Sequence, residues 1–245
     1  MRVGILETGR VAEELVDRHG TYPDMFVRLL AGADPGLEFE AVKVLEGALP
    51  GSPQAADAWL VTGSKHGVYD PMPWIEPLKA FLREARGAGV PLIGICFGHQ
   101  IMAEAFGGRA EKSDRGWGCG PHVYTTLQRP GWMADAPGPM RFHAMHQDQV
   151  TAIPGDATRL AESDFCPHAM LAYGDPEAPD AISIQPHPEF EPDYARDLLV
   201  ARRGVAVPAP AAQAGIDAIG APVDNAAFAR WVAAYLRARA ARQAA

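Results

Sequence analysis

Hydrophobic and polar positions follow two different periods along this chain, and the change between them predicts the order of its elements. Short apolar runs typical of buried parallel strands occupy residues 2–7, 57–62, 90–95 and 181–185, and an alternating pattern at 39–45 predicts a further strand. Apolar positions at helical spacing predict helices at 21–30, 74–86, 97–106, 192–202 and 226–239. Strands that alternate with helices of this length indicate an α/β protein with a flavodoxin-like, doubly wound and mostly parallel sheet.

The pattern changes after residue 106. Short β-like segments at 123–127, 140–145, 158–161 and 169–173 are separated by turns rich in Gly, Pro and Asp. We expect a small mixed or antiparallel β extension of the same domain, so that residues 1–245 form one unit. The Ala- and Pro-rich stretch 204–223 is expected to be a loop or a partly helical insertion before the closing helix.

Composition restricts the class of protein. Hydrophobic residues make up 48% of the chain, but no apolar stretch approaches the length of a membrane span, so we expect a soluble protein with no membrane partner. The net charge is −8 and the basic residues are scattered, which argues against nucleic acid as a partner. The chain begins directly with a strand, without a signal-peptide pattern, and its three cysteines form no CxxC pair. These features predict a cytoplasmic location, and no cofactor is expected.

The candidate chemistry centres on Cys96, at the junction between the predicted strand 90–95 and the helix that follows. Gly94 and Gly98 flank this cysteine, and a Gly-x-Cys-x-Gly pattern predicts a nucleophile elbow, a turn so sharp that only glycine fits beside the raised residue. The amino end of a helix favours the thiolate anion, which is the reactive form of cysteine. The simpler alternative is a small cysteine packed in the core.

A cysteine nucleophile needs a base, and the base needs an acceptor that fixes its tautomer. His187 follows the predicted core strand 181–185, at the sheet edge where Cys96 is also expected, and Glu189 comes two residues later. His187 is therefore the best candidate base and Glu189 the best orienting group, although a histidine beside prolines is often only an exposed loop residue. The order Cys, His, Glu differs from that of α/β-hydrolases, in which the acid precedes the histidine.

Residues 94–100, Gly-Ile-Cys-Phe-Gly-His-Gln, together with residues 185–189, Gln-Pro-His-Pro-Glu, closely resemble the motifs of class I (triad) glutamine amidotransferases. The loop 62–64, the pair 116–117 and the segment 146–148 are most similar to the branch that contains the glutaminase domain of GMP synthase and the plant γ-glutamyl peptidases. The sequence departs from the motifs of this family at two places. Pro186 stands where the family usually has a bulky apolar residue, and Lys65 and His66 follow Ser64 where many members have proline.

The resemblance implies roles for individual residues. Cys96 would attack a γ-carboxamide and form a γ-glutamyl thioester, and His187, oriented by Glu189, would protonate the departing ammonia and then activate water. The amides of Gly63 and Phe97 would form the oxyanion hole. The resemblance also implies that four residues bind the α-amino and α-carboxylate groups of the substrate: Gln100, Gly116, Trp117 and Gly118. Three further residues would lie at the rim of the site: Ser64, His146 and Asp148.

Other chemistry-bearing residues have simpler interpretations. His143, His146 and Asp148 resemble a metal site in spacing, but a separation of three places the two histidines on opposite faces of a strand, so no metal is expected. Cys119, Cys166 and His99 are expected to be packing residues. Trp117 fits either the wall of a glutamine pocket or a cover over the core.

Three functions remain open at this stage. The first is hydrolysis of glutamine with release of ammonia. Its possible partner is a separate synthetase or acceptor subunit, because no such domain is expected on this chain. The second is a γ-glutamyl peptidase or hydrolase acting on glutathione-like or γ-glutamyl-amine compounds. The third is a non-catalytic regulatory or binding module on the same fold.

Overall fold

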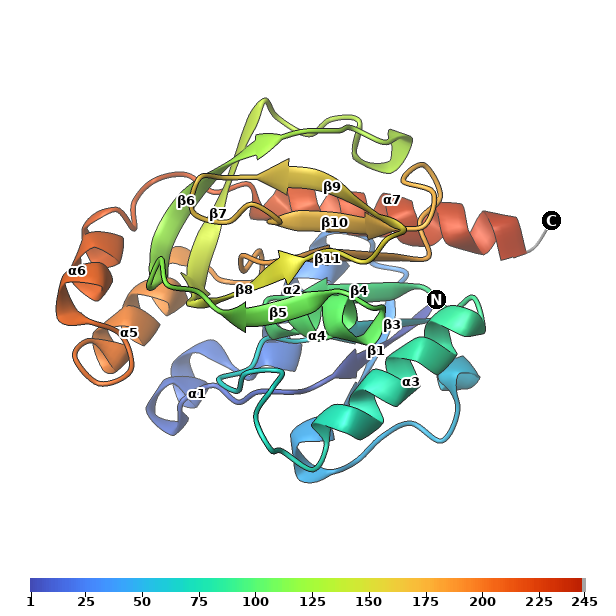
Figure 1. The fold of residues 1–245 in the computed structure, drawn as a ribbon, viewed down its shortest axis with the longest axis horizontal. Coiled ribbons are helices and arrows are strands. Elements are labelled where there is room, and N and C mark those ends of the chain that lie inside the picture. Colours follow the sequence, from blue (N-terminus) through green and yellow to red (C-terminus); the bar gives the residue numbers. More distant parts are fainter. Residues whose placement is uncertain (244–245) are drawn as a thin grey trace.

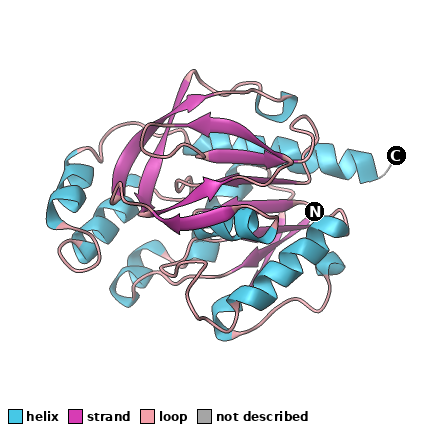
Figure 2. Cartoon of the chain, in the orientation of Figure 1, coloured by secondary structure: helices cyan, strands magenta, loops and turns pink. Residues whose placement is uncertain are grey.

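Five parallel strands form one half of a nine-stranded sheet (Figure 1). The computed structural model describes residues 1–243, so the expected domain end at Ala245 lies outside them. The strand order is β2 (Glu38–Val42), β1 (Arg2–Leu6), β3 (Ala58–Val61), β4 (Leu92–Ile95) and β11 (Ala181–Ile184). The strands β3, β4 and β11 are buried at every position, as expected where helices cover both faces (Figure 2). The predicted doubly wound sheet is confirmed.

The other half of the sheet is antiparallel and continues beyond β11. Its strands are β10 (Met170–Tyr173), β9 (Ala157–Glu162), β6 (Gly118–Thr126) and β7 (Pro139–His146). A separate two-stranded ribbon consists of β5 (Arg109–Lys112) and β8 (Asp148–Ala152). The expected β extension is therefore present, whereas both strands of the ribbon were not predicted from the sequence.

Helices cover the sheet on both faces. One face packs against α2 (Tyr22–Ala33) and α7 (Asn225–Gln243), and the opposite face packs against α3 (Ile75–Gly87) and α4 (Phe97–Ala105). A third apolar cluster joins α1 (Glu13–His19), α5 (Pro192–Arg202) and α6 (Ala209–Asp217), with α5 and α6 at the left end in Figure 1. Three short 3₁₀ turns complete the elements: Val44–Glu46, Pro53–Ala55 and Gly131–Met133.

The Ala- and Pro-rich stretch 204–223 contains α6, so the expectation of a partly helical insertion is correct. This helix packs closely on β6: a Cβ atom added at Gly120 would lie 2.7 Å from the Cα atom of Gly215. The insertion therefore covers the start of β6.

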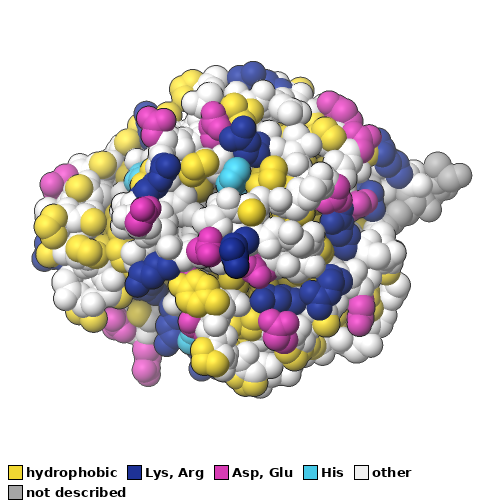
Figure 3. Space-filling view, in the orientation of Figure 1, with side chains coloured by type: hydrophobic (Ala, Val, Ile, Leu, Met, Phe, Trp, Pro, Cys, Tyr) yellow, Lys and Arg dark blue, Asp and Glu magenta, His cyan; other side chains and the backbone are white. Residues whose placement is uncertain are grey.

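The surface agrees with the scattered charge of the sequence, because acidic and basic side chains intermingle on the face shown in Figure 3. Among residues 1–243, no helix combines the length and the apolar character that a membrane crossing requires.

Candidate active site

The turn between β4 and α4 holds Cys96 in a strained backbone conformation. Its φ is 54° and its ψ is −101°, and it is the sole non-glycine residue with positive φ within residues 1–243. The backbone is held there from both sides, because the amide of Cys96 donates to Ile184 O at 2.9 Å and its carbonyl accepts from Gln100 N at 3.0 Å. The structure thus shows the sharp strand-to-helix turn that the glycine pattern predicted.

Close contacts explain the two glycines of this turn. A Cβ atom at Gly94 would lie 2.5 Å from Met102 Sδ, and one at Gly98 would lie 2.4 Å from the backbone oxygen of Val61. Both distances are below any ordinary van der Waals contact, so the turn excludes side chains at either position. The expectation that only glycine fits beside Cys96 is confirmed.

His187 and Glu189 form a buried pair beside Cys96. The Nδ1 atom of His187 lies 2.7 Å from Glu189 Oε1, and the two side chains are 5% and 0% exposed. Cys96 lies beside the same ring, close enough to influence its pKa directly. The loop that carries His187 is fixed by its amide, which donates to His143 O at 2.8 Å, and by stacking of the imidazole on Phe190 with centroids 4.0 Å apart. The structure therefore brings together the three residues that the sequence pattern singled out.

Electrostatics favour a charged His187. Burial alone would lower the pKa of this imidazole, but the negative charges of Cys96 and Glu189, together with hydrogen bonds to both, raise it above its ordinary range. An imidazolium between a thiolate and a carboxylate is the charge state in which a histidine holds a cysteine ready for attack.

Gly63 and Phe97, the residues expected to form the oxyanion hole, both lie next to Cys96. A Cβ atom at Gly63 would lie 2.9 Å from His187 Cε1 and 3.7 Å from Cys96 Cβ, so the backbone of this residue directly borders both side chains. Phe97 is the first residue of α4, where backbone N–H groups have no partner inside the helix. Neither of these two amides donates a hydrogen bond to any group within residues 1–243.

Thr8 holds the Gly63 turn in place, and sequence analysis missed it. Its amide donates to Thr62 Oγ1 at 3.0 Å, and its hydroxyl donates to Thr62 O at 2.9 Å. Both threonines are buried at the ends of neighbouring parallel strands. A threonine within two residues of the end of each of two buried strands is the signal that would have found the pair.

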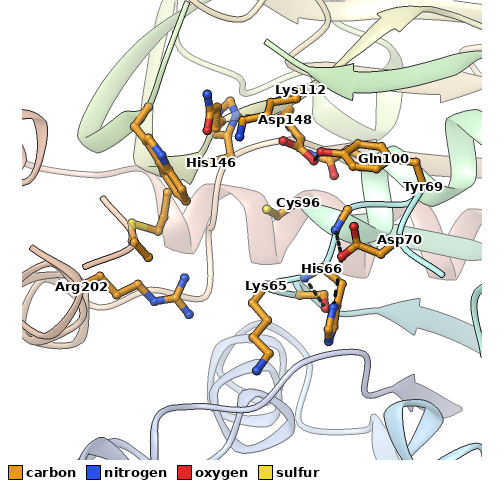
Figure 4. Close-up of a pocket in the computed structure, with 16 residues that line it drawn as sticks. Lys65, His66, Tyr69, Asp70, Cys96, Gln100, Lys112, His146, Asp148 and Arg202 are labelled. Atoms are coloured by element: carbon orange, nitrogen blue, oxygen red, sulfur yellow. Dashed lines mark hydrogen bonds and ion pairs between the residues drawn. The ribbon is translucent and has the colours of Figure 1, made fainter. Parts of the chain in front are cut away.

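Cys96 opens into a cavity of about 500 Å³, which we call the active-site cavity (Figure 4). Of the residues expected at the site, six line it: Ser64, Cys96, Gln100, Trp117, His146 and Asp148. Gly116 and Gly118 flank Trp117 and do not line it themselves. The cavity also includes residues that sequence analysis did not connect with the site: Gly67, Tyr69, Asp70, Lys112, Met145, Gln147, Arg202 and Ala206. Trp117 therefore belongs to the cavity wall, one of its two interpretations.

Polar contacts within the protein restrict what Gln100 and His146 offer to a ligand. Gln100 Nε2 donates to Asp148 O at 2.9 Å and to Gln185 Oε1 at 3.2 Å, which leaves the amide oxygen for a ligand. His146 Nδ1 lies 3.1 Å from Asp148 O, and burial lowers the pKa of this ring to about 3. A binding role for either side chain stays a prediction.

A loop lies over one side of the active-site cavity. Tyr69, in the segment after β3, donates its hydroxyl to Asp148 Oδ2 at 2.8 Å, and His66 Nδ1 lies 3.2 Å from Asp70 Oδ2. Figure 4 shows Tyr69 reaching toward Asp148, with Asp70 and His66 below it on the same side of Cys96. The rim position expected for Asp148 is thus a point at which the loop is tethered.

The residues expected to pack do so. Cys166 is buried, and Cys119 is half-buried. His99 is buried with Nδ1 at 2.7 Å from Ser183 Oγ. Within residues 1–243, no group of three or more His, Cys, Asp or Glu side chains is arranged to hold a metal ion.

A doubly wound sheet that presents a strained cysteine at the start of a helix, next to a buried His–Glu pair, defines an α/β protein of the nucleophile-elbow class. The sequence profile of the family "Glutamine amidotransferase class-I" matches residues 50–206. The chain therefore belongs to the class I glutamine amidotransferase family.

Individual relatives agree with this assignment. Gamma-glutamyl peptidase 4 of Arabidopsis thaliana is 27% identical over 192 residues, which cover 74% of this chain and 72% of the relative. A glutamine-hydrolysing GMP synthase subunit from Halobacterium salinarum is 31% identical over 186 residues, or 71% of this chain and 87% of the relative. The crystal structure of a glutamine amidotransferase from Methylobacillus flagellatus shares the fold, with a TM-score of 0.76 at 19% identity over 98% of this chain and 94% of the other. Family and relatives together support a hydrolase activity.

Proposed function

We propose that this protein hydrolyses the γ-glutamyl amide bond of glutamine or of a glutamine-like compound through a thioester on Cys96. The observation that carries the proposal is the position of Cys96 beside the buried, hydrogen-bonded pair of His187 and Glu189, at the ends of β4 and β11. Residues 1–245 would act as one catalytic domain, and the reaction needs no cofactor or metal.

The geometry supports a two-step reaction. The Cys96 thiolate attacks the γ-carbonyl carbon, and the amides of Gly63 and Phe97 stabilise the resulting oxyanion. When this intermediate collapses, the C–N bond breaks, the nitrogen takes the proton of His187, and ammonia or an amine leaves. Water then attacks the thioester and gives one proton to His187, so that glutamate leaves and the thiolate is restored.

Two substrate classes fit this chemistry. The GMP synthase relative is named as a glutamine-hydrolysing protein, which favours glutamine as the substrate and transfer of ammonia to a separate synthetase subunit. The Arabidopsis relative is named as a γ-glutamyl peptidase, which favours γ-glutamyl peptides or amines and needs no partner. The active-site cavity of about 500 Å³ is a specific observation in favour of the second class, because it has room beyond a single amino acid.

A mass-spectrometric screen of glutamine, γ-glutamyl peptides and γ-glutamyl amines tests the proposal. We expect release of glutamate by the wild type and a loss of at least about a thousandfold in Cys96→Ala. Cys119→Ser is the matched control, because this half-buried cysteine lies outside the active-site cavity. Equal activity of Cys96→Ala and wild type on every compound would refute the proposal, and no turnover by either protein would favour a non-catalytic binding module.

A further inference from the structure

A second cavity, of about 470 Å³, adjoins the active-site cavity. The two cavities share four residues of their walls: Ser64, Lys65, His66 and Arg202. From there the second cavity extends to the segment after β1, residues 8–12, and to Met72 and Trp74. The two cavities are therefore neighbours, and Lys65 and Arg202 belong to the walls of both.

The walls of the second cavity carry positive charge only. Its lining includes Arg10, Lys65 and Arg202 and contains no Asp or Glu, although the chain as a whole has a net charge of −8. Arg10 is paired with Glu46, whereas Lys65 and Arg202 have no ion-pair partner within residues 1–243. Arg202 is also half-buried. Because an unpaired, partly desolvated guanidinium is unfavourable, this arrangement suits an anionic ligand.

Apolar and donor groups complete the second cavity. Val11, Met72 and Trp74 supply apolar wall. Trp74 is 3% exposed, and its indole N–H has no acceptor within residues 1–243. Figure 4 shows Arg202 and Lys65 together on one side of Cys96, opposite His146 and Asp148.

We propose that Lys65 and Arg202 bind the free carboxylate of the leaving group, so that the substrate is a γ-glutamyl amino acid or γ-glutamyl peptide. This inference rests on the function proposed above and selects its substrate class. Ammonia, the leaving group of glutamine, carries no carboxylate and would leave both cations and the second cavity without a ligand. The amine nitrogen of the departing amino acid takes the proton of His187, and water supplies the new carboxylate oxygen of glutamate.

Matched substrates isolate the charge of the leaving group. The specificity ratio is kcat/KM for γ-glutamyl-glycine divided by kcat/KM for γ-glutamyl-glycinamide, two compounds that differ mainly in the terminal carboxylate. We expect the wild-type ratio to exceed about ten, because a charge-assisted hydrogen bond of the kind Arg202 offers is worth about one order of magnitude or more in binding. We expect Arg202→Gln to lower the ratio about tenfold and Lys65→Gln, whose side chain is exposed, to lower it less.

Arg83→Gln is the control variant, because Arg83 is exposed on α3, away from both cavities, and has no ion pair within residues 1–243. Its ratio should equal that of the wild type. A wild-type ratio near one, or a ratio that Arg202→Gln does not change, would overturn the inference and leave the γ-glutamyl hydrolase itself intact. An equal loss on γ-glutamyl-glycine, γ-glutamyl-glycinamide and glutamine would also overturn it, by showing that Arg202 binds the glutamyl part. If the wild type cleaves no γ-glutamyl compound faster than Cys96→Ala, the proposed function fails and the inference fails with it.

Discussion

The properties of single residues at this site depend on their immediate neighbours. Cys96 keeps a positive φ because backbone hydrogen bonds, one donated to Ile184 O and one accepted from Gln100 N, hold it on both sides. His187 has a raised pKa because a carboxylate and a sulfur atom oppose the effect of its burial. Each feature would be unfavourable on its own, and each is stabilised by contacts from a different part of the chain.

Replacing Glu189 tests the electrostatic part of this description. In Glu189→Gln the carboxylate charge is lost, so the pKa of His187 falls toward its ordinary value. Because the protonated ring delivers the proton to the leaving group, the alkaline limb of the kcat/KM profile should move to lower pH, with a loss of about tenfold or more at the optimum. Glu191→Gln, at an exposed position before α5, is the control, and the alkaline limb of its kcat/KM profile should match that of the wild type. An alkaline limb at the wild-type pH in Glu189→Gln would contradict the role of Glu189 in raising the pKa of His187.

The elements that carry the site were largely predictable from sequence, because buried parallel strands and their helices have strong periodicity. The predicted helix 192–202 coincides with α5, and the strand and helix around Cys96 are present as expected. The helix α1 and the strands β5 and β8 were missed. Helix α1 has no side-chain cap and no buried residue, and β5 is mostly exposed, so the local sequence of both lacks the usual signals.

Features of the site that depend on contacts between distant segments could not be predicted from the local sequence. The strand expected at 123–127 begins earlier, at Gly118, because residues 118–122 pair with β7 although Gly118, Gly120 and Pro121 are poor strand formers. Lys65 was recognised as a change at the mouth of the site, whereas Arg202, far along the chain in α5, gave no signal that it lines the same cavity.

The elbow between β4 and α4 makes a stability prediction. Gly98→Ala places a Cβ atom against the backbone oxygen of Val61, which cannot move without shifting β3, so we expect a loss of about 2 kcal/mol or more in the free energy of unfolding. Gly87→Ala, at the end of α3, meets no atom within 4 Å and should be neutral or stabilising by up to about 1 kcal/mol. Urea denaturation of both variants measures the difference, and equal midpoints would show that the elbow tolerates a side chain.

For the molecule as a whole, buried neutral histidines link stability to pH. Burial lowers the pKa of His99 and His146 to about 3, and burial together with the charge of His187 lowers that of His143 to about 4. In the unfolded chain these rings titrate near the ordinary value of about 6.5. The unfolded state therefore binds more protons than the folded state between these values, and stability falls as pH decreases through that window. His187 adds no slope below about pH 6, because the ring is protonated in both states there; between about pH 6 and pH 7 its raised folded pKa contributes in the opposite sense, which offsets less than the effect of one of the three neutral rings.

We expect the free energy of unfolding to decrease by at least about 1 kcal/mol between about pH 7 and about pH 5, since each such histidine contributes up to about 1.4 kcal/mol per pH unit. Urea denaturation at the two pH values measures this change. His99→Gln removes one titrating group and should reduce the difference. Constant or increasing stability on acidification would contradict the assignment of these rings as neutral in the folded protein.

Covalent labelling of Cys96 tests the central claim most directly. The wild type, Cys96→Ala and Cys119→Ser are each incubated with 6-diazo-5-oxonorleucine, a glutamine-mimicking electrophile, and analysed by intact-protein and peptide mass spectrometry. The account predicts one adduct per chain on Cys96 in the wild type and in Cys119→Ser, slowed by an excess of a γ-glutamyl substrate, and no adduct in Cys96→Ala. An unlabelled wild type, or labelling that persists in Cys96→Ala, would contradict it.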